Sequence, residues 1–143
     1  MAVRYRVARR DLEKAIKAAV RASRAGGFES CGLLSASGSK LHLLPLKNKR
    51  KRPGGFAFYA SEVRTTVRQT ERTGAEVVGT FHSHPYAPAI PGSTDCQFAA
   101  DDSLMLVIDV LARHVALWRI SKKKSVRIAL QKVDAPKPER RRG

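Results

Sequence analysis

The sequence predicts a single α/β (α+β) domain in which a mixed central β-sheet is flanked by helices. Its 143 residues suit one domain that can bury roughly two-thirds of its unfolded surface. Short apolar runs typical of strands alternate with helical patterns along the chain. Because no apolar run approaches the roughly 20 residues that would cross a bilayer, no membrane association is expected.

The first part of the chain predicts a strand, a helix and a hairpin. Residues 3–7 alternate like a strand, and Asp11 opens a helical pattern that ends at the glycine pair 26–27. Cys31–Leu34 and Leu41–Leu44 then predict two strands joined through a small, turn-prone segment, which is the pattern of a hairpin.

The second part predicts further strands around a proline-rich loop. After a basic loop at 47–52, a short strand is expected at 56–59, followed by a helix that Ser61 caps and that stops at Gly74. A buried strand at 77–81 runs straight into His82, and prolines make the following segment a rigid loop. A short helix at about 93–100 precedes strands at 104–108, 115–118 and 126–133.

The chain is strongly basic. It has 28 Lys and Arg against 12 Asp and Glu, a net charge of +16, and much of the excess lies at 47–52 and from Lys122 to Arg142. These segments are either a solvated loop and tail or a weak contact surface for nucleic acid or an acidic protein. The domain is expected to span residues 1–134, and 135–143 to form a basic, disordered tail.

Two further features bear on location. Cys31 and Cys96 are too few for a disulfide scaffold and are expected to be buried thiols of a reducing compartment. The first residues lack the continuous apolar stretch of a secretion signal. A cytoplasmic location is therefore expected.

The residues that carry chemistry are His82, His84 and Asp95. Residues two apart in an extended segment point the same way, so both imidazoles can reach one zinc ion, and a carboxylate from the next helix can add a third ligand. The fourth position then holds a water whose pKa zinc lowers to roughly 7, which predicts a hydrolytic site. The alternatives are two surface histidines and an aspartate that complements a helix dipole.

The spacing of these residues resembles the JAMM motif of the MPN-plus metallopeptidases, whose prokaryotic form is the JAB domain. Upstream, the segment that begins at Glu29 and continues through Cys31 to Leu34 looks like that family's Glu-x-Cys-Gly-Leu-Leu segment. The resemblance implies an MPN/JAB, cytidine-deaminase-like fold, a zinc cofactor, and Glu29 as the acid/base residue. It also implies a protein substrate cleaved near the C-terminus of a ubiquitin-like or sulfur-carrier protein.

One position departs from the family pattern. The family serine lies three residues before the Asp, where this chain has Gly92, and a serine follows one place later as Ser93. In the family that hydroxyl helps to stabilise the oxyanion, and losing such a donor typically costs about 10² to 10³ in rate. Ser93 is therefore a candidate catalytic residue that either takes this role or caps the helix.

Three functions remain open from the sequence. The first is a zinc metallopeptidase or isopeptidase, and the second is a non-catalytic binding module whose basic surface binds nucleic acid or an acidic protein. The third is a DNA-associated relative of bacterial proteins that share the motif, although neither basic segment is interleaved with aromatic residues. The remaining His and Cys residues and the single Trp are expected to be structural: His42, His114, Cys31, Cys96 and Trp118.

Overall fold

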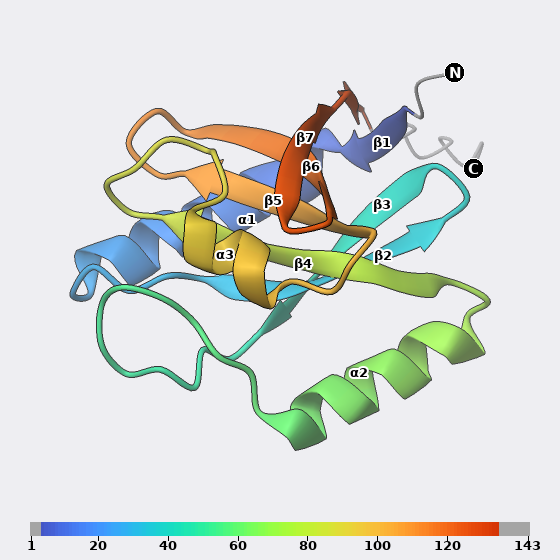
Figure 1. Cartoon of the computed structure of the whole chain (residues 1–143), viewed down its shortest axis with the longest axis horizontal. Helices are drawn as coiled ribbons and strands as arrows, with labels where there is room; N and C mark the ends of the chain where they lie inside the picture. The colour runs from blue at the N-terminus through green and yellow to red at the C-terminus, as the bar shows by residue number, and fades with distance from the viewer. Residues whose placement is uncertain (1–3, 135–143) are drawn as a thin grey trace, which may run out of the picture.

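An eight-stranded mixed sheet forms the centre of the computed structural model, which describes residues 4–134 (Figure 1). In chain order the elements are β1 (Tyr5–Ala8), α1 (Arg9–Arg24), β2 (Cys31–Ser37), β3 (Lys40–Leu46), α2 (Ala60–Arg72), β4 (Glu76–His84), α3 (Ser93–Phe98), β5 (Ser103–Asp109), β6 (His114–Ser121), β7 (Lys124–Ile128) and β8 (Leu130–Val133). The strand order is β7-β6-β5-β4-β2-β3-β1-β8, and β1 with β3, β1 with β8 and β4 with β5 are parallel pairs. The predicted single-domain α+β fold with a mixed sheet is confirmed.

The last strand prediction is wrong in one respect, because residues 126–133 form parts of two strands. β7 ends at Ile128 and β8 begins at Leu130, and the two stand at opposite ends of the strand order. Since Ala129 alone separates them in the chain, the sheet curls until its two edges approach each other. The N–H of Tyr5 in β1 donates to the Ala129 carbonyl at 3.3 Å, next to the pairing of β1 with β8.

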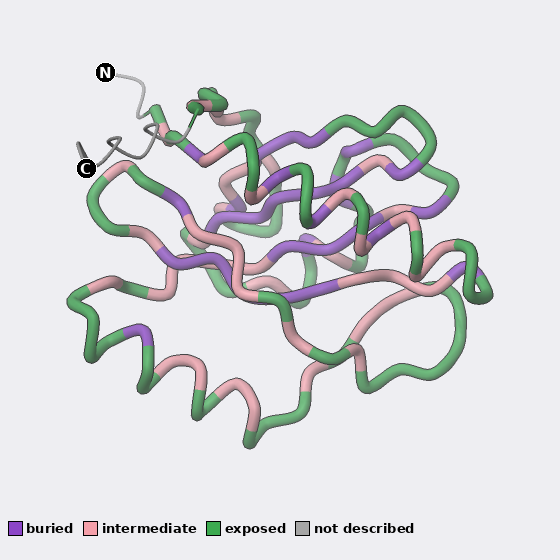
Figure 2. Tube along the Cα trace, turned by 180° about the vertical axis from the view of Figure 1, so that it is seen from behind, coloured by how far each residue is buried: buried purple, intermediate pink, exposed green. Residues whose placement is uncertain are grey.

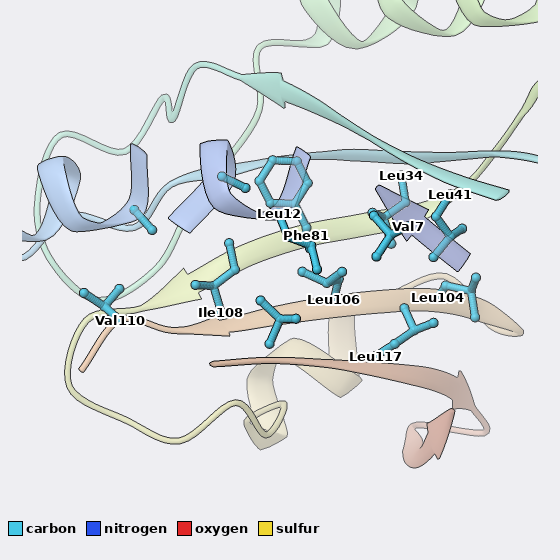
Figure 3. Packing of buried hydrophobic residues seen from close by; sticks show 13 residues of the cluster. Val7, Leu12, Leu34, Leu41, Phe81, Leu104, Leu106, Ile108, Val110 and Leu117 are labelled. Carbon is cyan, nitrogen blue, oxygen red and sulfur yellow. The ribbon is translucent and has the colours of Figure 1, made fainter. Parts of the chain in front are cut away.

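Apolar side chains fill both faces of the sheet. Along β5, Leu104, Leu106 and Ile108 belong to the cluster that α1 covers (Figure 3). Met105 and Val107 belong to the opposite cluster, which includes a residue of α3. Because neighbouring strand residues point to opposite faces, burial on both sides turns β5 into the continuous apolar run seen in the sequence. The buried segments accordingly gather in the central strands (Figure 2).

The segment at 56–59 is a loop and not the predicted strand. Gly54 and Gly55 adopt positive φ angles of 90° and 138°, which turn the chain sharply before it. The Asn48 side chain then takes the place of a strand partner, because its oxygen accepts the N–H of Ala57 at 3.2 Å and its amide group donates to the Gly55 carbonyl at 3.2 Å. Apolar alternation alone could not reveal this side-chain pairing.

Helix boundaries differ slightly from the expectations. α1 begins at Arg9, so Asp11 lies in its first turn, and it ends just before the predicted glycine pair. α2 begins at Ala60 with Tyr59 as its N-cap residue, so Ser61 lies inside the helix and does not cap it. α3 is shorter than expected and ends at Phe98.

The predicted basic tail, 135–143, lies outside the described residues. Across 4–134, no helix combines the length and the apolar character that crossing a membrane requires.

The close approach of β4 and β5 gives a stability prediction. A Cβ atom on Gly79 would lie 1.8 Å from the Leu104 carbonyl oxygen, so Gly79→Ala must push two paired central strands apart. We expect the free energy of unfolding, measured with denaturant, to fall by about 1–3 kcal/mol. Gly92→Ser is the control, because a Cβ there meets only Asp95 Oδ2 at 3.5 Å. Equal stabilities of the two variants would contradict the strand geometry.

Candidate metal centre

Three side chains converge where β4 ends. His82 and His84 are alternate residues of β4 and therefore point to the same side, and Asp95 is the third residue of α3. The His82 Nε2 atom lies 3.0 Å from His84 Nε2 and 3.2 Å from Asp95 Oδ2, and His84 Nε2 lies 3.5 Å from the same oxygen. The structure thus brings together the three residues that the sequence singled out as metal ligands.

The three donor atoms fit a small divalent cation. A tetrahedral zinc ion with ligands at about 2.0–2.1 Å separates its ligand atoms by about 3.3–3.4 Å, close to the three distances of 3.0, 3.2 and 3.5 Å. Two imidazoles and one carboxylate are also donor types that suit zinc. Three protein donors leave one position of such an ion open.

The surroundings of the histidines set their orientation. The Nδ1–H of His84 donates to the Pro88 carbonyl at 2.8 Å, which leaves its Nε2 lone pair directed at the other donors. His82 is fully buried and stacks on Phe56, with ring centroids 4.9 Å apart. Its Nδ1 atom has no hydrogen-bond partner among the described residues.

The carboxylate of Asp95 is fixed in its ionised form. Its Oδ2 accepts the N–H of Gly92 at 2.8 Å, at the start of α3. Burial acts to raise the pKa of Asp95, but hydrogen bonds with His82 and His84 outweigh it and hold that pKa well below its usual range. The bond to Asp95 in turn raises the pKa of His84, against the effect of burial. Asp95 therefore supplies the negative charge that a metal site needs.

Glu29 lies beside this group because of strand register. Cys31 of β2 pairs with His82 of β4, and the N–H of Ser83 donates to the Ser30 carbonyl at 3.0 Å, so the same antiparallel register places Glu29 opposite His84. Burial raises the pKa of the Glu29 carboxyl above its usual range, and the nearby histidines oppose this only in part. A half-buried carboxyl group with a raised pKa next to possible metal ligands is a candidate for proton transfer.

A groove of about 1000 Å³ opens onto the site. Glu29, His84 and Asp95 line it, together with Phe58, Phe98 and part of β4. Ser93, the first residue of α3, is exposed and also lines the groove, while Gly92 is the N-cap residue of that helix. Ser93 therefore lies inside the helix and does not cap it.

Two residues that hold the site were missed by sequence reasoning. Ser83, between the two histidines, is fully buried, and its hydroxyl accepts the N–H of Ser30 at 2.8 Å. Asn48 donates to the Glu29 carbonyl at 2.9 Å and so ties the segment before β2 to the loop that carries Phe56. Asn48 is the one uncharged residue in the basic segment 47–52. This exception was the only feature of the sequence that pointed to a structural role for Asn48.

The other residues expected to be structural lie outside the metal group. Cys31 and Cys96 are buried free thiols, and burial, with the charges of Glu29 and Glu62, raises the pKa of Cys31 to about 12. Such a thiol stays protonated and unreactive. The Trp118 indole N–H donates to the Ala89 carbonyl at 2.9 Å and fastens the proline loop to β6.

Comparison with known proteins adds the family. A model described as prokaryotic homologs of the JAB domain matches residues 12–121. The chain is also similar to a desampylase from Pyrococcus furiosus, with 25% identity over 113 residues that cover 78% of this chain and 80% of that protein.

Solved structures share the fold. The chain is similar to a protein from Desulfitobacterium hafniense, with a TM-score of 0.78 and 25% identity over 92% of this chain and 94% of that one. A JAB1/MPN domain protein from Archaeoglobus fulgidus shares the fold, with a TM-score of 0.54 and 18% identity over 89% and 99% of the two chains. Because the family match spans more than half of the sequence, the chain belongs to the prokaryotic homologs of the JAB domain.

Proposed function

We propose that the protein is a zinc-dependent isopeptidase or peptidase that cleaves near the C-terminus of a ubiquitin-like protein. The observation that carries the proposal is the convergence of two Nε2 atoms and one carboxylate oxygen within 3.5 Å of one another, next to a half-buried glutamate. The similarity to a desampylase supports isopeptidase-type hydrolysis and a ubiquitin-like substrate. Two buried free thiols are in keeping with a cytoplasmic location.

In this proposal each residue has one task. His82, His84 and Asp95 would hold the metal ion, which would make a bound water acidic enough to ionise near neutral pH. Glu29 would act as the general base that accepts a proton from the attacking water and as the general acid that returns it to the leaving amine. The Ser93 hydroxyl donates a hydrogen bond to the substrate oxygen on which negative charge develops.

The groove explains how a protein could be a substrate. Its volume of about 1000 Å³ and its open form suit an extended peptide tail. Phe58 and Phe98 offer apolar contact along it, and the side chain of Phe98 is 80% exposed. A flexible C-terminal tail could enter the groove while the folded body of its protein stays outside.

A non-catalytic binding module is the second candidate. The observation that favours it is Gly92, which puts no side chain at the position of the family serine. Chelator-sensitive turnover distinguishes the two functions. Fusions of ubiquitin-like proteins with cleavable C-terminal extensions should be hydrolysed by the purified protein, and a chelator should stop the reaction. Full zinc occupancy without turnover of any fusion would favour the binding module.

Metal content tests the ligand assignment separately. His82→Ala and His84→Ala should each reduce zinc from one ion per chain to a small fraction, because two donors hold the ion far more weakly than three. Elemental analysis of the purified variants gives the answer. His114→Ala is the matched control, since this histidine is exposed, lies two strands from His84 and does not belong to the metal group. Stoichiometric zinc in either site variant would show that the ion is bound elsewhere.

A further inference from the structure

The basic loop, Lys47–Arg52, is a feature that the catalytic site does not explain. We propose that this loop is a docking surface for an acidic face of the protein substrate, beside the groove that takes the substrate's tail. The inference rests on the proposed function and goes beyond it by naming the charge of the partner's surface.

The five cations of the basic loop are available to a partner. They are all exposed, and none of them forms an ion pair within the described part of the chain: Lys47, Lys49, Arg50, Lys51 and Arg52. Unpaired like charges held close together repel each other, and an anionic surface relieves that repulsion. The loop is therefore complementary to an acidic partner.

The basic loop borders the groove directly. Arg50 lines the groove, and its Nη1 atom lies 3.0 Å from where a Cβ on Gly55 would stand. Gly55 itself donates its N–H to the Glu29 carboxylate. A protein whose tail lies in the groove would thus bring its folded body against the basic loop.

Hydrogen bonds also fix the backbone of the first half of the loop. The Asn48 oxygen accepts the N–H groups of Arg50 and Ala57 at 2.9 and 3.2 Å, and its amide group donates to the carbonyls of Glu29 and Gly55. The Lys49 N–H also donates to the Ala57 carbonyl at 2.8 Å. A backbone that is already ordered adds little to the conformational entropy lost when a partner binds.

The end of α1 widens the basic surface. Pro53, directly after the loop, lies 3.9 Å from where a Cβ on Gly27 would stand, and the cartoon shows the end of α1 next to the loop (Figure 1). Arg21 and Arg24 occupy the last turn of α1 and are exposed. The basic area next to the groove therefore extends beyond the loop itself.

The fold offers a matched control cluster, Lys122–Lys124, at the far end of the sheet. His84 pairs with Asp109, which pairs with His114 at the start of β6, so the site lies at that end of the strands. Ser121 and Lys124 pair at the other end, where β6 turns into β7. Removing three charges there changes net charge as much as removing three from the basic loop.

A binding experiment tests the docking surface without turnover. A labelled oligoglutamate peptide should bind the wild type, and rising salt should weaken it. The triple variant Lys47→Gln, Lys51→Gln, Arg52→Gln should bind it about tenfold more weakly, and the variant with Lys122–Lys124 all changed to Gln less than twofold more weakly. Equal losses in both variants, or wild-type binding no tighter than to oligoglutamine, would overturn the proposal. Tighter binding of duplex DNA, lost in the loop variant, would assign the loop to nucleic acid instead.

A turnover experiment adds the link to the substrate. On a cleaved ubiquitin-like fusion, the loop variant should raise KM about tenfold with kcat unchanged, and on the isolated tail peptide neither value should change. An equal rise of KM on the peptide would make the loop part of the groove and would contradict docking. If no fusion is cleaved, the proposed function fails, and the binding experiment still decides the role of the loop.

Discussion

Glu29→Gln should keep one zinc ion per chain and lose about 10² to 10⁴ in kcat, because a general base typically contributes that factor. The amide has nearly the shape of the carboxylate, so the groove and the strand register that position residue 29 stay intact. An amide cannot accept the proton of an ionising water at neutral pH. Turnover of a cleaved fusion, together with the zinc content of the same sample, measures both effects.

Turnover and zinc content of Glu29→Gln, measured together, distinguish three roles for Glu29. A metal ligand would lose zinc on substitution, and a structural residue would lose neither zinc nor rate. Glu71→Gln, on the exposed side of α2, is the control for the loss of one negative charge from the protein. Equal turnover by wild type and Glu29→Gln would remove the glutamate from the mechanism.

The core of the site was predictable because its signals are local. His82 and His84 follow a buried strand at period two, and Asp95 starts the next helix, so short-range geometry already directs their side chains together. Glu29 carries no such signal in its own segment. Its role was inferred from the family resemblance. The pairing of Cys31 with His82, between segments about fifty residues apart, accounts for the position of Glu29 beside the histidines.

The features that sequence reasoning missed depend on long-range pairing. Asn48 replaces a strand partner for residues near Phe56, so the apolar alternation at 56–59 predicted a strand that the structure lacks. The break at Ala129 sends β7 and β8 to opposite edges of the sheet, and no local pattern reveals which edges close on each other. The periodicity of apolar residues predicts which side of a segment is buried. It does not predict which strand lies next to that segment in the sheet.

Residue 92 is glycine where the family has serine, and the effect of this difference on kcat can be measured. Gly92 has φ −74° and ψ 167°, a conformation that any residue adopts, so the backbone does not require glycine there. A serine Cβ would make an ordinary contact of 3.5 Å with Asp95 Oδ2. Because serine and glycine are both accepted at an N-cap, stability should change by only a few tenths of a kcal/mol. Substitutions at this position therefore report on chemistry and not on folding.

Ser93→Ala should keep its zinc and lose about 10² to 10³ in kcat, the usual cost of one donor to a developing oxyanion. Adding Gly92→Ser to this variant should restore at least a tenfold part of that rate, because it returns a hydroxyl to the position the family uses. Both values come from turnover of the same fusion, with zinc content as the control for an intact site. If Ser93→Ala turns over like the wild type, Ser93 donates nothing to the reaction. The single variant Gly92→Ser then measures directly what the missing hydroxyl costs this protein, because any increase in kcat would come from a donor that the natural sequence lacks.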